Sequence, residues 1–319
     1  MKHLTALTLT FAFGAAPALA QPKLIATIAM IGEPAAQIAA SCAEVETMMG
    51  PGIDPHLYQA SAGDVRTLAD ANAILYAGYN LEGQLGEVFA KLGAKKPVLA
   101  VSELAATPDQ LIREEGAEYA DPHLWMDAAL WSGIAKPIAD SLAELDPDCA
   151  EASDRGQTYA EELFALDDWI RRSIETIPAE QRVMVTAHDA FAYYGRAYGI
   201  DVVGIQGIST ESEASIADIR ATVDLVIDRN VPAIFVESTI NPRTVEAVIE
   251  AAEARGHALS LGEELYSDAM GEAGTAEGTY IGMLHSNTVS VVQALGGTVQ
   301  PLPTALHDWA ERWGLALDG

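Results

Sequence analysis

Residues 146–178 read DPDCAEASDRGQTYAEELFALDDWIRRSIETIP, and they predict a helix long enough to connect two halves of a molecule. Asp146 can cap its start, Pro147 suits its first turn and Pro178 closes it. Roughly 27 residues at about 1.5 Å each give a rod of about 40 Å. An apolar stripe recurs along it at helical spacing, at Tyr159, Leu163, Leu166, Ile170 and Ile174.

Short apolar runs lie on both sides of this helix, with helical patterns between several of them. Before it, we expect a helix at 60–71 and strands at 24–30, 45–48, 73–76 and 98–101. After it, we expect strands at 183–186, 202–205 and 233–236. We also expect a helix at 213–229 that carries Ile216, Ile219, Val223 and Val226 on one face. The alternation predicts two α/β lobes with mostly parallel sheets, joined by one long rigid helix.

The expected domain boundaries follow from these patterns and from the N-terminus. Residues 1–20 combine Lys2, an apolar run without acids and a small-x-small ending, which is typical of a cleaved signal peptide. The run is too short to span a membrane. No cysteine follows the cleavage point, so we expect a periplasmic protein without a lipid anchor. The N-terminal lobe is then 21–146, the linking helix 147–178 and the C-terminal lobe 179–319.

The chain is strongly acidic. Its 319 residues carry a formal net charge of −28 and half of them are hydrophobic, so large cores can form. The charge argues against nucleic acid and anionic membranes as partners. It favours cations in a general way, although a solvated acidic surface explains most of it.

Two cysteines are present, Cys42 and Cys149. In an exported protein they permit one disulfide, and two inert thiols are the alternative. Without a CxxC pairing they make a poor zinc cluster.

The sequence Asp-Pro-His-Leu-aromatic occurs twice, at 54–58 and 121–125. The proline holds the preceding aspartate extended, so each loop can present its histidine, His56 or His123. A third histidine, His188, follows the expected strand at 183–186, where ligands of open α/β sheets bind. The pattern favours a metal site whose remaining ligand is an oxygen from the second lobe. A repeated turn with structural histidines is the alternative.

Acidic residues near these histidines could support such a site. Asp54 and Asp121 could each accept a ring N–H or cap a helix. Glu211 and Glu237 lie near strand ends of the second lobe, where they could bond His188 or serve helix capping.

Four segments together resemble the zinc- and manganese-binding solute receptors of bacterial ABC transporters. They are GIDPHLYQASAGDVRTLADANAILYAGYNLE, ADPHLWMD, VTAHDAFAYYGRAYGI and ELYSDAMGEAGTAEGTYIGMLHSN, in the family's order. The resemblance as a whole runs from about residue 24 to 297. The resemblance implies a receptor that captures one Zn²⁺ or Mn²⁺ ion between its lobes and delivers it to a membrane ABC permease. It implies the ligands His56, His123, His188 and Asp268, a monomer, and no enzyme activity.

The ligand set does not choose between zinc and manganese. Three imidazoles and a carboxylate suit Zn²⁺, and they can hold Mn²⁺ when the carboxylate binds through both oxygens. Many manganese receptors of the family have Glu at the position of His188, and many zinc receptors have a His-rich loop where 105–119 has none. Neutral imidazoles are required, so affinity is expected to fall as the pH drops through about 6.5.

Other classes of protein remain open on the residues alone. An exported zinc hydrolase would need an open water position, and no HExxH or GxSxG is present. A receptor for a metal chelate would keep the histidines farther apart than about 8 Å, with an aromatic cleft. A secondary role in cell adhesion through the acidic surface is a further possibility.

Overall fold

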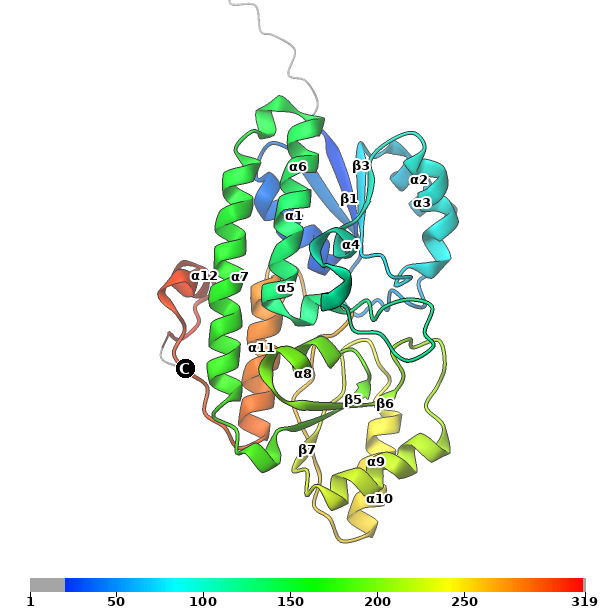
Figure 1. Cartoon of the computed structure of the whole chain (residues 1–319), viewed down its shortest axis with the longest axis vertical. Coiled ribbons are helices and arrows are strands. Elements are labelled where there is room, and N and C mark those ends of the chain that lie inside the picture. Colours follow the sequence, from blue (N-terminus) through cyan, green and yellow to red (C-terminus); the bar gives the residue numbers. More distant parts are fainter. Residues whose placement is uncertain (1–20, 318–319) are drawn as a thin grey trace, which may run out of the picture.

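The computed structural model describes residues 21–317, so the expected signal peptide lies outside the described residues. Figure 1 shows two α/β lobes stacked along the long axis, with the helix α7 (Ala152–Ile174) running beside both. Within 21–317, no helix is both long and apolar enough to cross a bilayer.

The N-terminal lobe is a parallel sheet with the strand order β2-β1-β3-β4. Its strands are β1 (Lys23–Ile28), β2 (Glu44–Met49), β3 (Ala73–Tyr76) and β4 (Val98–Ala100). Its helices are α1 (Ala29–Ala39), α2 (Ala62–Asp70), α3 (Gly86–Gly93), α4 (Val101–Ala105), α5 (Ala128–Trp131) and α6 (Ala135–Leu145). Because all four strands are parallel, the loops after β1, β2, β3 and β4 meet at one edge, which faces the other lobe.

The C-terminal lobe repeats the parallel pattern with shorter strands. β5 (Val183–His188) pairs with β6 (Asp201–Gln206), and β7 (Ala233–Ile234) pairs with β8 (Ser260–Leu261). The Phe235 N–H donates to the Val185 carbonyl at 2.9 Å, so the two pairs lie side by side. The helices that follow β5 along the chain are α8 (Ala192–Tyr198), α9 (Ile216–Asp228), α10 (Arg243–Ala254), α11 (Tyr280–Ala294) and α12 (His307–Trp313).

The long helix forms as predicted but begins later than expected. Asp146 accepts the Asp148 N–H, and Pro147–Cys149 forms a separate 3₁₀ turn before α7 starts at Ala152. The α-helix therefore has 23 residues, about 35 Å. Every residue of the expected apolar stripe is buried: Tyr159, Leu163, Leu166, Ile170 and Ile174. These residues pack α7 against α1 and α6 in one lobe and α8 and α11 in the other.

Three details of the prediction were wrong. Ile216 is 70% exposed, because it is the first residue of α9 and lies beyond the edge of the core that buries Val223 and Val226. Ala29 and Met30 begin α1 instead of extending the first strand. The short strand β8 was not foreseen, because two residues give no alternating pattern.

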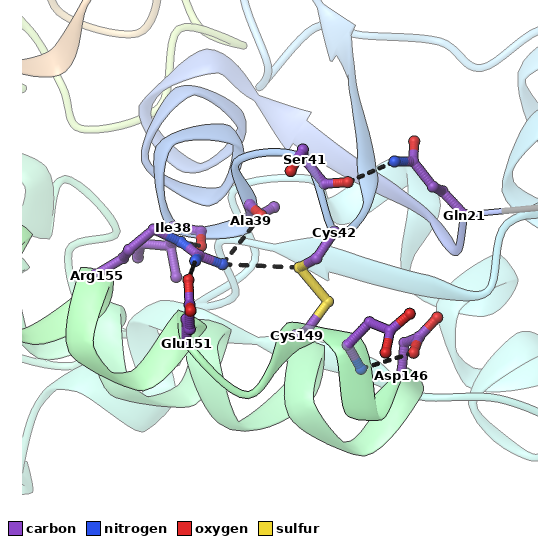
Figure 2. Close-up of a disulfide and its surroundings, with 10 residues drawn as sticks. Gln21, Ile38, Ala39, Ser41, Cys42, Asp146, Cys149, Glu151 and Arg155 are labelled. Carbon is purple, nitrogen blue, oxygen red and sulfur yellow. Dashed lines mark hydrogen bonds and ion pairs between the residues drawn. A yellow bond between two sulfur atoms is a disulfide. The ribbon is translucent and has the colours of Figure 1, made fainter.

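Cys42 and Cys149 form a disulfide (Figure 2). It joins the segment between α1 and β2 to the turn that precedes α7, at the end of the sheet opposite the interlobe edge. Arg155 of α7 donates to the carbonyls of Ile38 (2.6 Å) and Ala39 (3.1 Å) beside it. The bridge therefore fastens the start of the long helix to the first lobe.

We expect the double variant Cys42→Ser/Cys149→Ser to lose about 2–4 kcal/mol of unfolding free energy, because the bridge constrains a long loop of the unfolded chain. Denaturant titration measures the loss. Adding reductant should lower the stability of the parent protein by a similar amount and leave the variant unchanged. Equal stability of parent and variant under oxidising conditions would contradict the prediction.

Candidate metal centre

The first DPHL loop follows β2 and carries His56. The Asp54 carboxylate accepts the His56 backbone N–H at 2.8 Å and the Thr210 hydroxyl of the other lobe at 2.6 Å. Asp54 therefore shapes the turn and ties it across the cleft, with both of its oxygens used in bonds other than to the His56 ring. His56 is only 7% exposed.

The second DPHL loop begins with the same turn and adds one bond. Asp121 Oδ1 accepts the His123 backbone N–H at 2.9 Å and also the ring Nδ1–H at 2.7 Å. The ring also lies edge-on to Trp125, with centroids 5.2 Å apart. The bond to Nδ1 leaves the Nε2 lone pair free to bind a cation.

His188 is the last residue of β5, as the strand-end pattern predicted. Glu237 Oε1 accepts both its backbone N–H and its ring Nδ1–H at 3.0 Å, and Oε2 accepts the Ala187 N–H at 2.9 Å. Of the two readings for Glu237, the bond to His188 is therefore correct. Glu211 is exposed and makes no contact with His188 of this kind; Ser209 caps its backbone N–H instead.

Asp268 approaches from a loop of the C-terminal lobe. The Trp125 indole N–H donates to the Ser267 carbonyl at 2.8 Å, which fixes this loop to the residue two positions after His123. On the other side the Asn287 amide bonds both the N–H and the carbonyl of Tyr266, at 2.8 and 2.7 Å. The loop is thus held from both lobes.

Four buried side chains meet between the lobes. One ligand atom from each of His56, His123, His188 and Asp268 lies within 4.8 Å of all the others. Asp268 Oδ1 is 3.2 Å from His123 Nε2, and Oδ2 is 3.2 Å from His188 Nε2 and 3.7 Å from His56 Nε2. The Nε2 atoms of His56 and His123 are 3.4 Å apart.

These spacings fit a single ion. Ligands about 2.0–2.2 Å from a tetrahedral centre are about 3.3–3.6 Å from one another. In addition, His188 Nε2 and both Asp268 oxygens are buried without a hydrogen-bond partner. Buried polar atoms almost always have partners, so this cluster has the donor set and the unmet bonding capacity of a cation site.

The charges in the cluster shift its pKa values. Burial lowers the pKa of His56. Burial also opposes protonation of His123, but the carboxylates of Asp121 and Asp268 outweigh it and raise the pKa of that imidazole to about 9. The same balance, with Asp268 and Glu237, raises the pKa of His188. Burial alone would raise the pKa of Asp268, yet the facing imidazoles hold it well below its usual value.

The geometry bears on the alternatives left open by the sequence. The three imidazoles are far closer than the roughly 8 Å that would favour a chelate receptor. The described histidines outside the cluster bond elsewhere or stack on aromatic rings: His257 bonds the Val231 carbonyl, His307 bonds the Leu302 carbonyl, and His285 stacks on Trp169.

Comparison with known proteins gives a consistent result. Residues 24–294 match the family model described as the periplasmic component A of the zinc-uptake complex. The chain is 48% identical to zinc-binding protein TroA of Treponema pallidum over 289 residues, 90% of this chain and 93% of that protein. It is 41% identical to manganese-binding lipoprotein MntA of Bacillus subtilis over 276 residues, 86% of this chain and 90% of that protein.

A solved structure has the same fold. The periplasmic zinc-binding protein TroA of Treponema pallidum superposes with a TM-score of 0.83 and 47% identity, covering 86% of this chain and 99% of that one.

The two aspartates of the repeat provide a matched pair of variants. We expect Asp121→Asn to weaken metal binding about 10–100-fold, because it removes the charge that orients and polarises the His123 ring. Asp54 shapes the same turn but does not bond the His56 ring. The loss of metal affinity in Asp54→Asn should therefore be at least several-fold smaller than in Asp121→Asn. Competition titration against a chelator measures both. Equal losses would show that the bond to the ring has no special role.

Metal binding should release at least one proton per ion at pH 7. His123, with a pKa of about 9, is protonated in the metal-free protein below that pH and must be neutral to bind. Affinity should therefore rise with pH up to about 9, well above the 6.5 expected from an unperturbed imidazole. Calorimetry in two buffers of different ionisation enthalpy counts the protons. Heats that do not depend on the buffer would contradict this.

Proposed function

This chain belongs to the family of periplasmic zinc-uptake complex component A, and from that premise we propose that it captures one divalent transition-metal ion between its lobes. It is a solute receptor, which delivers the ion to a membrane ABC permease, and not an enzyme. The observation that carries the proposal is the convergence of four buried ligand side chains, of which His188 Nε2 and both Asp268 oxygens have no hydrogen-bond partner.

In this proposal His56, His123, His188 and Asp268 are the ligands. Three neutral imidazoles and one carboxylate leave the bound dication a net charge of +1, and the buried carboxylates of Asp121 and Glu237 lie directly behind two of the rings. That arrangement offsets the cost of burying the ion. A zinc hydrolase instead keeps one coordination position for water, which four protein ligands would fill.

The ion is Zn²⁺ or Mn²⁺. The zinc-binding and the manganese-binding relative are both similar to this chain along most of its length. The three nitrogen donors favour Zn²⁺, which also binds such sites more tightly in the usual order of affinities.

We also infer the cellular setting and the chain's organisation. Residues 1–20 direct export and are removed, and Gln21 at the expected cleavage point gives no cysteine for a lipid. The receptor acts in the periplasm as a monomer. Its units are the lobes 21–146 and 179–319 and the linking helix 147–178.

Metal content of protein exported to the periplasm tests the proposal. We expect about one equivalent of zinc or manganese by mass spectrometry in the parent protein, and none in His56→Ala or Asp268→Ala. His257→Ala, which removes a histidine outside the cluster, should keep its metal. Zinc that excess manganese cannot displace identifies a zinc receptor, whereas manganese or ready exchange identifies a manganese or mixed one. No metal in the parent, even after reconstitution, would refute the proposal.

A further inference from the structure

A pocket of about 320 Å³ adjoins the metal centre, and His56 is the one ligand among its lining residues. One wall comes from 79–83 and the loop 114–122 of the N-terminal lobe, and the other from Ile208, Ser209 and Glu211 of the C-terminal lobe. The other three ligands are 0–2% exposed, against 7% for His56. The pocket therefore lies on the side of the metal centre where His56, the most exposed of the four ligands, reaches solvent.

One lining residue, Asp121, has a buried carboxylate oxygen without a hydrogen-bond partner. Asp121 is only 1% exposed and bonds the His123 loop through Oδ1 alone. Its Oδ2 atom is buried and has no hydrogen-bond partner. The Asp121 side chain has no exposed surface, so it adds negative charge behind the lining without contacting an ion in the pocket.

The charge of the lining is entirely negative. Glu114, Glu118 and Glu211 line the pocket with exposed side chains, and no Lys or Arg is among the lining residues. The nearby Arg113 donates hydrogen bonds to the carbonyls of Ala117 and Glu118 and is not among the lining residues. A cleft lined by one sign of charge concentrates ions of the opposite sign and raises their association rate.

The glutamates do not form a second site that would hold a bare ion. Within 21–317, the cluster of His56, His123, His188 and Asp268 is the one group of such side chains close enough to share an ion. At about 30 Å³ per water, 320 Å³ has room for about ten water molecules. The pocket thus suits a hydrated cation held through its water shell.

The loop that forms one wall is fixed at its base by the other lobe. The Asp121 N–H donates to the Ile112 carbonyl at 2.9 Å and closes the loop. The Tyr193 hydroxyl accepts the Ile112 N–H at 3.1 Å and donates to the Asp121 carbonyl at 3.0 Å. The pocket is therefore preformed and does not depend on a moving lid.

We propose that this pocket is the vestibule through which the ion reaches and leaves the metal centre, a step that rests on the proposed function. Glu114, Glu118 and Glu211 collect the hydrated dication, the buried Asp121 carboxylate adds its charge behind the lining, and His56 is the first ligand to replace a water. The three glutamates then set the rate of capture without being ligands.

Stopped-flow binding of Zn²⁺, followed by tryptophan fluorescence, tests the vestibule. At low ionic strength, Glu114→Gln/Glu118→Gln/Glu211→Gln should bind Zn²⁺ about five- to tenfold more slowly than the parent protein. The control Asp228→Asn/Glu250→Gln/Glu253→Gln changes the net charge equally at exposed sites on and beside α9 and α10, and should slow it less than twofold. The difference should vanish near 1 M salt, where the screening length is about 3 Å.

A second variant tests the route itself. Ala117→Trp narrows the pocket without changing charge or ligands, so it should slow association and dissociation by the same factor, at least threefold, and leave Kd unchanged. A merely structural defect would change Kd. Equal stoichiometry with unaltered rates in both vestibule variants would overturn the vestibule alone, whereas a parent protein that binds no Zn²⁺ would overturn the proposed function with it.

Discussion

The carboxylate of Asp268 is buried against three imidazoles, with its oxygens 3.2 Å from the Nε2 atoms of His123 and His188. Contacts from both lobes hold it there. Such a group is costly unless a positive charge faces it, either protons on the histidines or a metal ion. The carboxylates of Asp121 and Glu237 behind the rings favour protonated histidines when no ion is bound. Protons and the metal ion therefore compete for the same imidazole nitrogens. In either state a positive charge faces the Asp268 carboxylate.

Keeping four ligands from two lobes within a few ångströms requires that the lobes hold their relative position. α7 packs on helices of both, and Trp125, Tyr193 and Thr210 each bond across the cleft close to a ligand loop. Rotation of one whole lobe against the other would break all of these contacts together. These contacts therefore oppose release of the ion by opening of the whole cleft.

Local patterns in the sequence were enough for the α/β class, the long helix and the three clustered histidines. The repeated DPHL and the strand before His188 each have a signal within a few residues, and the resemblance to a family supplied Asp268. The alternatives that the sequence left open depend on distant contacts. Glu237 meets His188 across 49 positions, and Asp121 bonds a ring while Asp54, in the same four-residue motif, bonds Thr210 instead. Ile216 has the spacing of the apolar stripe on α9, but its side chain is exposed because the core does not extend as far as the first residue of that helix.

The disulfide gives the first lobe the topology of a closed ring. Cys42 and Cys149 are 107 positions apart, and both DPHL loops lie on the chain between them. A single protease cut in the exposed stretch 113–116 would leave two pieces that remain covalently tied, with His56 on one and His123 on the other. In an oxidising compartment the disulfide keeps the two fragments of such a cleaved molecule together, so His56 and His123 stay close to each other. In a reducing compartment the disulfide would open and the fragments could separate. The bridge thus protects the continuity of the site as well as the stability of the fold.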